Sequence, residues 1–305
     1  MPELERVTAL PAVPFRSPEG HKGTYGHALI VAGSRGMSGA ASLAGRSALR
    51  GGAGLVTVAV PAGIQPIVAG VEAAYMTVGL PETSAGCFSL RASKPLLQRA
   101  EQATAVAIGP GCGNSASVGC LVRELYASLL QPVLVDADGL NVLADDFLSG
   151  TFSAPGPRVL TPHPGEFARL LGSDTKWVQS HRAELAAEFA ARHNVVLLLK
   201  GRQTVISDGR RIAVNTTGNA GMATGGTGDV LTGLIAALLA QGWAPFEAAQ
   251  LGAHLHGLAG DLAVARLGQL DRGMENSPVN STGVRGGMIS SDLLESLPAA
   301  WNFLA

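Results

Sequence analysis

The chain has 305 residues, a length that fits one large α/β domain with a full hydrophobic core. Its 22 basic residues are balanced by 23 acidic ones, and the net charge of −1 excludes a general attraction for nucleic acid or for an anionic membrane. Hydrophobic residues make up 47% and charged residues 15% of the chain, which is typical of a compact soluble protein. We therefore expect its partners to be small molecules.

The mean hydropathy of +0.26 raises the question of a membrane protein. The apolar runs Leu234–Ala240 and Val195–Leu199 are much shorter than the roughly 20 residues that a membrane-spanning helix needs. The first twenty residues mix charges with prolines and have no continuous apolar core, so they do not resemble a secretory signal. We expect a cytoplasmic protein without a membrane segment.

The cysteines and the paired histidines do not predict a metal centre. Cys87, Cys112 and Cys120 are odd in number and lack metal-ligand spacing, so we expect buried, unreactive thiols. His254 and His256 lie two residues apart in a helical segment and would point to different faces of it. Joint coordination of a metal by this pair is therefore not expected.

Six apolar runs are expected to form a parallel sheet, because each is apolar on both faces. They are Ala28–Ala32, Leu55–Val60, Thr104–Ile108, Val133–Asp136, Arg158–Leu160 and Val195–Leu199. The helical segments between them are Ala40–Arg50, Ser117–Leu130, Glu166–Leu171 and Gln179–His193. This alternation predicts a doubly wound, mostly parallel sheet with helices on both faces.

Two more strands, Thr204–Ser207 and Arg211–Val214, are joined by Asp208-Gly209, which favours a tight turn. The last third of the chain is expected to be mostly helical. Residues 268–287 are rich in Gly, Ser, Pro and Asn and predict a flexible surface loop before a short final helix at Ser291–Leu297. We interpret residues 1–305 as a single domain without a separate lid, with residues 1–21 as an N-terminal extension.

The strongest functional pattern is the glycine-rich stretch of residues 216–229, which leads directly into an apolar helical run. The first N–H groups of such a helix are unpaired and form a natural anion site. We expect Gly226, Thr227 and Gly228 to hold a transferring phosphate, and Asp229 to accept a proton from the attacking hydroxyl. On spacing alone, a capping Asp with glycines for tight packing fits equally well.

Glycine loops also follow two of the expected strands, where open parallel sheets bind their ligands. Gly33–Ala40 has glycines at three-residue spacing and Ser38 as a candidate N-cap, and Gly109–Gly111 carries a stiffening proline. Neither is a Gly-x-Gly-x-x-Gly fingerprint or a Walker A motif. The alternative for the first loop is a tight turn without a ligand.

Charged residues follow three other strands. Thr161–Glu166 places His163 between two prolines, so its ring would project at a defined angle from a rigid loop, although a lone His is often structural. Asp136 and Asp138 could assist magnesium or hold a substrate, and turn caps explain them nearly as well. Lys200 could meet phosphate or be an exposed lysine.

These stretches carry a family resemblance. Gly-Gly-Thr-Gly-Asp before a helix resembles the anion-hole and catalytic-base motif of ribokinase-like kinases. Six stretches, in order and over nearly the whole chain, are similar to the NAD(P)H-hydrate dehydratase family. They are Lys22–His27, Ala28–Ala32, Gly33–Ala40, Ile108–Gly111, Thr161–Glu166 and Leu199–Gly201.

The resemblance implies a ribokinase-like fold and assigns roles to residues. Substrate-binding residues would be Ala40, Gly111, His163 and Asp229. Nucleotide-binding residues would be Lys200, Gly201, Arg202, Gln203, Thr204 and Gly228. Glu166 occupies the place where related kinases keep a carboxylate that organises Mg²⁺, and it would act through water.

The implied reaction is metabolite repair, the dehydration of (6S)-NADHX and (6S)-NADPHX to NADH and NADPH with ADP converted to AMP and phosphate. The preference for ADP over ATP rests only on similarity to bacterial members. The family also implies a homo-oligomer, often a tetramer, and an NAD(P)H-hydrate epimerase supplied from elsewhere, since the chain begins almost directly at the dehydratase pattern.

Two alternatives remain. A thiazole or hydroxymethylpyrimidine kinase shares Gly-Thr-Gly-Asp, but the Thr161–Glu166 and Lys22–Gly26 stretches argue against it. A non-catalytic nucleotide-binding protein would gain little from a carboxylate beside bound phosphate, so Asp229 argues against it.

Overall fold

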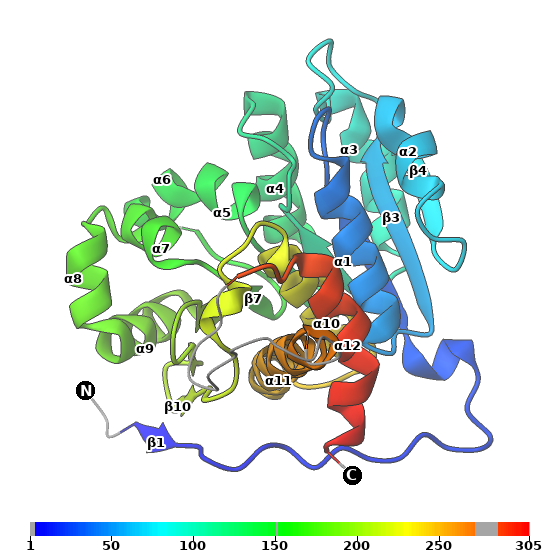
Figure 1. The fold of residues 1–305 in the computed structure, drawn as a ribbon. Helices are drawn as coiled ribbons and strands as arrows, with labels where there is room; N and C mark the ends of the chain where they lie inside the picture. The colour runs from blue at the N-terminus through cyan, green and yellow to red at the C-terminus, as the bar shows by residue number, and fades with distance from the viewer. Residues whose placement is uncertain (1–3, 151, 272–285, 305) are drawn as a thin grey trace.

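The computed structural model describes residues 4–150, 152–271 and 286–304. A ten-stranded sheet has the strand order β1-β10-β9-β8-β7-β6-β5-β2-β3-β4. Neighbouring strands are parallel except for β9, which is antiparallel to both β8 and β10. Helices lie on both faces of the sheet (Figure 1). The predicted doubly wound α/β fold is confirmed.

The strands are β1 (Glu5–Arg6), β2 (His27–Val31), β3 (Leu55–Pro61), β4 (Met76–Leu80), β5 (Ala105–Ile108), β6 (Val133–Val135), β7 (Arg158–Leu160), β8 (Val196–Leu199), β9 (Val205–Ser207) and β10 (Arg211–Val214). The helices are α1 (Ser38–Arg50), α2 (Gln65–Ala69), α3 (Ser93–Ala100), α4 (Ala116–Ser128), α5 (Asp138–Val142), α6 (Ala144–Ser149), α7 (Pro164–Leu171), α8 (Thr175–Ser180), α9 (Arg182–His193), α10 (Thr227–Ala240), α11 (Pro245–Asp271) and α12 (Ser290–Asn302).

Burial on both faces explains why the central strands are apolar throughout. Along β2, Ala28 and Ile30 pack into a core formed with α1, α10, α11 and α12. Leu29 and Val31 point the other way, into a core formed with α3, α4, α7 and α9. Successive side chains of a strand alternate between faces, so a strand covered on both sides is predominantly apolar.

The eight predicted strands agree with the structure to within one residue at each end, and three predicted helices to within two. The prediction missed β1 and β4. Both lie at the edges of the sheet, and most of β4 is only partly buried, so it lacks the doubly apolar pattern. The predicted helix Gln179–His193 is confirmed at its end but begins three residues too early, because His181 leaves helical geometry and separates α8 from α9.

The C-terminal predictions need two corrections. Helix α11 continues to Asp271, so a loop cannot begin at residue 268, and residues 272–285 of that predicted loop lie outside the described residues. The last helix, α12, is longer than predicted and continues through Pro298. Ala300 beyond the proline is fully buried, and this burial favours the extra turn over an early stop.

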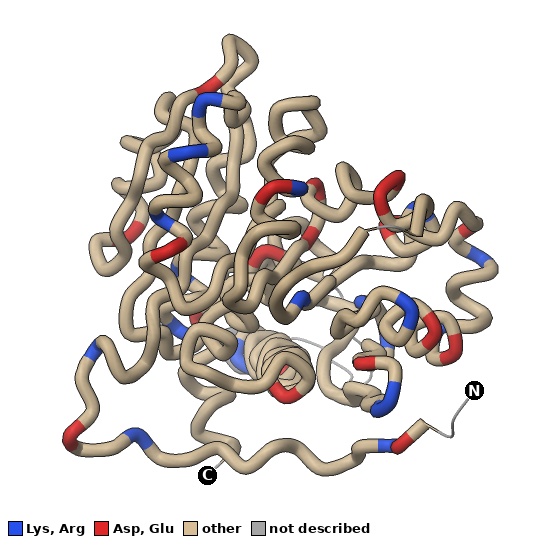
Figure 2. Tube along the Cα trace, turned by 180° about the vertical axis from the view of Figure 1, so that it is seen from behind, with Lys and Arg blue, Asp and Glu red and all other residues tan. Residues whose placement is uncertain are grey.

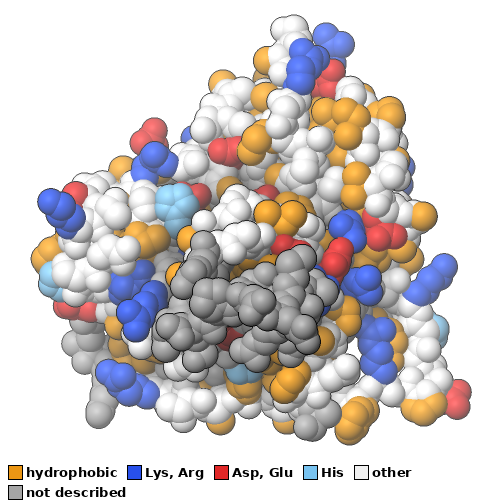
Figure 3. Space-filling view, in the orientation of Figure 1, with side chains coloured by type: hydrophobic (Ala, Val, Ile, Leu, Met, Phe, Trp, Pro, Cys, Tyr) orange, Lys and Arg blue, Asp and Glu red, His pale blue; other side chains and the backbone are white. Residues whose placement is uncertain are grey.

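Charges are mixed over the surface. Basic and acidic positions are scattered along the chain in Figure 2, and side chains of both signs are interspersed on the face in Figure 3. Within the described residues, no helix is both long and apolar enough to span a membrane. Of the three cysteines only Cys112 is buried, whereas Cys120 is exposed, which corrects the expectation that all are buried.

The strand order places a topological switch point between β2 and β5. From β2 the chain moves outward through β3 and β4, and then returns to add β5 on the opposite side of β2. Loops leaving the carboxyl ends of two such strands diverge and open a crevice for ligands. The loops after β6, β7 and β8 leave the same edge of the sheet, because these strands are parallel to β5.

Candidate active site

The loops after β2 and β5 are joined by hydrogen bonds at the switch point. The Gly33 N–H donates to the Pro110 carbonyl at 2.7 Å, and the Ser34 hydroxyl donates to the Gly111 carbonyl at 2.7 Å. Gly111 has φ +63°, and a methyl group added there would lie 3.0 Å from Cβ of Ala40. The predicted substrate-binding residues Ala40 and Gly111 are therefore neighbours.

Ser38 is not the N-cap of α1. It is the first residue of the helix, and Met37 occupies the N-cap without a side-chain hydrogen bond. The first amides of α1 consequently receive no cap from a side chain, and Met37 and Ala40 at this helix start lie beside Gly111. Uncapped amides at a helix start remain available to a polar ligand.

Helix α10 begins at the glycine-rich stretch, as predicted from the sequence. Gly226 is the N-cap with φ +89°, a left-handed conformation that suits glycine, and it supplies no side-chain cap. The Thr227 hydroxyl donates to the carbonyls of Met222 and Thr224 at 3.1 Å each, which holds the preceding turn in place. Because no side chain caps them, the first N–H groups of α10 are available to bind an anion.

Asp229 lies in the first turn of α10 and is partly buried. Burial raises its pKa to about 7, and the charge of Asp136 adds to the rise, whereas Lys200 opposes it. A carboxylate with a pKa near neutrality is suited to accept a proton during catalysis.

A buried ion pair lies beneath this helix start. Nζ of Lys200 is 2.8 Å from Oδ1 of Asp136 and 3.8 Å from Oε2 of Glu166. Oδ2 of Asp136 accepts a 2.7 Å hydrogen bond from the Thr232 hydroxyl. Burial alone would lower the pKa of Lys200, but the two carboxylates outweigh it and raise the pKa. Lys200 is not the exposed lysine that one interpretation of the sequence suggested.

His163 and Glu166 form a capping box at the start of α7. Nδ1 of His163 accepts from the N–H groups of Gly165 and Glu166, and Oε2 of Glu166 accepts from the His163 N–H at 2.8 Å. The His163 side chain is 55% exposed, so its outer face is open to a ligand even though its inner nitrogen has a structural role. Burial raises the pKa of Glu166, and Lys200 opposes that rise.

The predicted nucleotide-binding stretch forms a tight loop after β8. Gly201 has φ +134° and Gln203 has φ +57°, and the Thr204 hydroxyl donates to the Gly201 carbonyl at 3.0 Å. Arg182 of α9 donates to the carbonyls of Leu199 and Lys200 at 2.9 and 3.2 Å. Arg182, which is distant from this loop in the sequence, therefore stabilises its shape through these two hydrogen bonds.

The acidic stretch after β6 has separate local roles. Asp138 accepts from the Gly113 N–H at 2.8 Å, which ties it to the loop after β5, and Asn141 accepts from Arg169. Only Asp136 of this stretch reaches the buried ion pair. The sequence alone left the roles of Asp136 and Asp138 open, and the structure gives them different partners.

Three residues with contacts at this edge were not predicted from the sequence: Thr232, Ser34 and Arg182. His256 was considered there only as a metal ligand, and the structure gives it a different contact. Nε2 of His256 lies 2.8 Å from the Thr227 carbonyl, and burial lowers the pKa of this ring to about 4, so the ring is neutral and can donate there. A signal existed for Thr232, which is the polar exception in an apolar helix and lies three residues after Asp229. Arg182 and His256 form hydrogen bonds to backbone carbonyls, and no sequence motif predicts such contacts.

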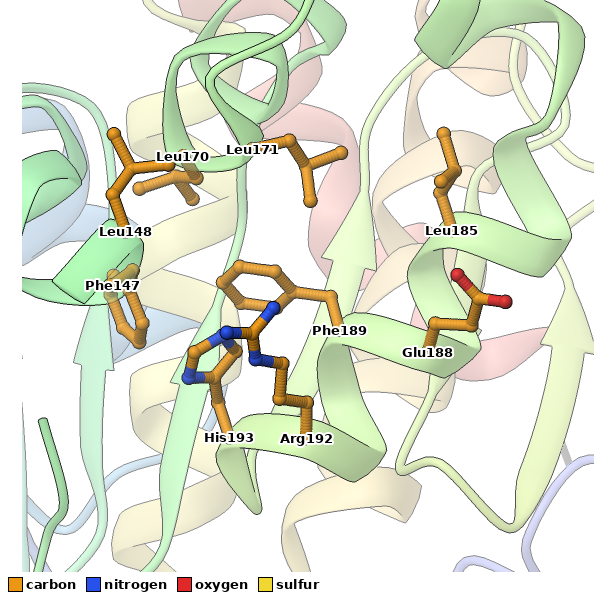
Figure 4. A pocket seen from close by; sticks show the side chains of 9 residues that line it. All are labelled: Phe147, Leu148, Leu170, Leu171, Leu185, Glu188, Phe189, Arg192 and His193. Carbon is orange, nitrogen blue, oxygen red and sulfur yellow. The ribbon is translucent and has the colours of Figure 1, made fainter. Parts of the chain in front are cut away.

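A pocket of about 160 Å³ lies away from these loops (Figure 4). It is lined by Phe147, Leu148, Leu170, Leu171, Leu185, Glu188, Phe189, Arg192 and His193 of α6, α7 and α9. None of these residues belongs to the loops at the carboxyl edge of the sheet. The candidate site residues described above lie at that edge instead.

Comparisons with known proteins identify the family. The family model of NAD(P)H-hydrate dehydratase matches residues 28–277. The chain belongs to the NAD(P)H-hydrate dehydratase family. It is 39% identical over 255 residues to the ADP-dependent (S)-NAD(P)H-hydrate dehydratase of Bacillus subtilis, covering 82% of this chain and 85% of that protein.

A longer relative and a solved structure support the same family. The chain is 48% identical over 290 residues to the bifunctional NAD(P)H-hydrate repair enzyme of Moorella thermoacetica, and it spans about half the length of that relative. The crystal structure of the ADP/ATP-dependent dehydratase of Bacillus subtilis, co-crystallised with ATP/Mg²⁺, superposes with a TM-score of 0.75 at 32% identity and covers 96% of this chain and 95% of its own. A hydroxyethylthiazole kinase of Pyrococcus horikoshii, at 15% identity and a TM-score of 0.57, shares the fold alone.

Proposed function

We propose that this chain catalyses the ADP-dependent dehydration of (6S)-NADHX and (6S)-NADPHX, returning NADH and NADPH. The observation that carries the proposal is the position of Asp229, a partly buried carboxylate with a raised pKa in the first turn of α10. Family membership supports the substrate class, and the related Bacillus subtilis protein is described as ADP-dependent.

In the proposed reaction, Asp229 accepts the proton of the hydroxyl on carbon 6 while that oxygen attacks the β-phosphorus of ADP. The phosphoanhydride bond breaks and AMP leaves. The N–H groups at Gly226–Gly228 stabilise the negative charge on the transferring phosphoryl group. The ring nitrogen then expels phosphate from carbon 6, a proton leaves carbon 5, and the double bond of the dihydropyridine ring returns.

The two substrates are assigned to adjoining parts of the carboxyl edge. The hydrated ring would lie against Ala40 and Gly111 at the switch point, with His163 reaching it from the start of α7. ADP would lie along Lys200–Thr204, with its β-phosphate at Gly228. A methyl group at Gly228 would lie 3.6 Å from Nζ of Lys200, so the loop and the helix start are close enough to share one phosphate.

A pocket of about 200 Å³ offers a place for the base of ADP. Val7, Val214 and His254 contribute to its walls. The pocket is next to the nucleotide-binding stretch, because the N–H of its lining residue Asn215 donates to the Thr204 carbonyl at 2.8 Å. A flat apolar base fits such walls, and the partly buried ring of His254 adds a polar partner.

Glu166 does not fit a direct magnesium ligand. Its Oε2 accepts from the His163 N–H, and its Oε1 lies 3.3 Å from Nε2 of His163. Among the described residues, no cluster of three or more His, Cys, Asp or Glu side chains could hold a metal ion. Magnesium would therefore be held by the phosphates of ADP and by water, with Glu166 acting at most through water.

Purified protein should be incubated with chemically prepared hydrated NADH and either ADP or ATP. We expect the absorbance of the dihydronicotinamide to recover in step with formation of AMP from ADP, and Asp229→Asn to slow this by a factor on the order of 10² or more. A stable phosphorylated product without recovery of NADH would instead identify a small-molecule kinase. Near-normal turnover of Asp229→Asn would reject the assigned base.

A further inference from the structure

Lys200 lies between two carboxylates that are both removed from solvent. The side chains of Asp136 and Glu166 are only 2% and 7% exposed, and that of Lys200 is 19% exposed. Its Nζ is 2.8 Å from Oδ1 of Asp136 and 3.8 Å from Oε2 of Glu166. Two buried carboxylates cannot both remain charged without a cation between them, because water no longer screens their repulsion.

The other oxygens of these carboxylates each already have a protein partner. Thr232 donates to Oδ2 of Asp136, and both oxygens of Glu166 face the backbone or ring of His163. The direction that the two carboxylates leave open is the one toward Nζ of Lys200. Carboxylate oxygens converging on one point are the arrangement that a hard divalent cation takes in proteins.

We propose that the Lys200 ammonium is a fixed internal cation at the point where Asp136 and Glu166 would otherwise bind a divalent metal ion. The chain itself then binds no Mg²⁺ between these carboxylates. The same ammonium lies directly beneath Gly228, where the proposed function places a phosphate, and contributes positive charge there. The inference deepens the proposed function, but its test needs neither hydrated dinucleotide nor turnover.

The test compares the nucleotide-free wild type with Lys200→Met, with Lys176→Met at an exposed lysine, and with the double variant Lys200→Met/Asp136→Asn. Thermal melting is followed in EDTA and in increasing MgCl2 at constant ionic strength, and Mn²⁺ binding is measured by electron paramagnetic resonance. We expect Lys200→Met to melt roughly 5 °C or more below the wild type in EDTA, because two buried carboxylates lose their cation.

Magnesium should raise the melting temperature of Lys200→Met selectively, and this variant should gain stoichiometric Mn²⁺ binding. The wild type, Lys176→Met and the double variant should show neither effect. Mn²⁺ binding by the nucleotide-free wild type would overturn the inference. So would a folded Lys200→Met that gains no metal binding.

If Lys200→Met fails to fold in EDTA, recovery of its far-ultraviolet circular dichroism in Mg²⁺, or on adding Asp136→Asn, supports the inference. Failure of both rescues overturns it, since the defect would not then arise from uncompensated carboxylates. A protein without dehydratase activity would still give these results, so failure of the proposed function can be told from failure of this inference.

Discussion

The hydroxyl of Thr232 donates a 2.7 Å hydrogen bond to Oδ2 of Asp136, and thereby joins the first turns of α10 to the carboxyl end of β6. Thr232 is three residues after Asp229, so this bond helps to set where the proposed base stands relative to the sheet. Thr232 is fully buried, and Asp136 is almost fully buried. Loss of the donor would leave a charged acceptor without its partner.

We expect Thr232→Val to lower the free energy of unfolding by about 1–3 kcal/mol, because the shape is kept but a buried carboxylate oxygen loses its donor. Thr232→Ser keeps the hydroxyl and should cost less. Urea denaturation of both variants measures the difference. Equal stability of the valine variant and the wild type would show that the hydrogen bond contributes nothing net.

The raised pKa of Asp229, about 7, predicts how activity depends on pH. A base must be ionised to accept a proton, so kcat should fall as the pH drops below about 7. The measurement is the pH profile of kcat with saturating hydrated NADH and ADP. A profile flat down to pH 5 would mean that Asp229 ionises at a much lower pH than its surroundings suggest.

The raised pKa of Asp229 also predicts how stability depends on pH, and the direction is opposite to that for an ion-paired carboxylate. Because the folded pKa lies above the usual 3.8, the folded state binds more protons than the unfolded state between about pH 4 and pH 7. Stability contributed by Asp229 should therefore fall as the pH rises through this window. Asp229→Asn should be more stable than the wild type at pH 8, by up to about 4 kcal/mol, and about equally stable near pH 4.

Two neighbouring glycines should respond differently to alanine. At Gly226, φ is +89° and an added methyl group would lie 2.6 Å from Cδ1 of Leu43, so Gly226→Ala should destabilise the fold by roughly 1 kcal/mol or more. At Gly228 a methyl group would meet only ordinary contacts, the nearest at 3.6 Å. Gly228→Ala should keep its stability but raise the KM for ADP, since the methyl group occupies space assigned to phosphate. Thermal melting and steady-state kinetics distinguish the two variants. Unchanged kinetics for folded Gly228→Ala would show that the β-phosphate of ADP does not bind at Gly228.

His163 has a capping role and a proposed contact with substrate, and substitutions can separate them. Asn is a good N-cap and can replace the acceptor Nδ1, but it removes Nε2. We expect His163→Asn to retain stability and raise the KM for the hydrated dinucleotide. His163→Ala should lose about 1 kcal/mol of stability as well. An unchanged KM for His163→Asn would leave the histidine with its structural role alone.

The sequence was sufficient for the elements that carry their own signal. The central strands are apolar on both faces, and the glycine-rich stretch before α10 announces a helix start without a side-chain cap, so both were predictable from local pattern. The edge strand β4 was not, because most of its residues are only partly buried and it lacks the doubly apolar pattern of the central strands. The break at His181 follows from local backbone geometry that propensity does not encode.

Residues 136, 166, 200 and 232 are distributed over nearly a hundred positions of the chain, and no spacing in the sequence connects them. By itself the sequence determined the fold class, the family and the position of Asp229, because these depend on periodicity and on a contiguous motif. Only the tertiary structure decided that Lys200 lies between two buried carboxylates, and that Thr232 is hydrogen-bonded to Asp136. Parallel strands bring their carboxyl ends to one edge, and this convergence in space gives those side chains a common electrostatic environment.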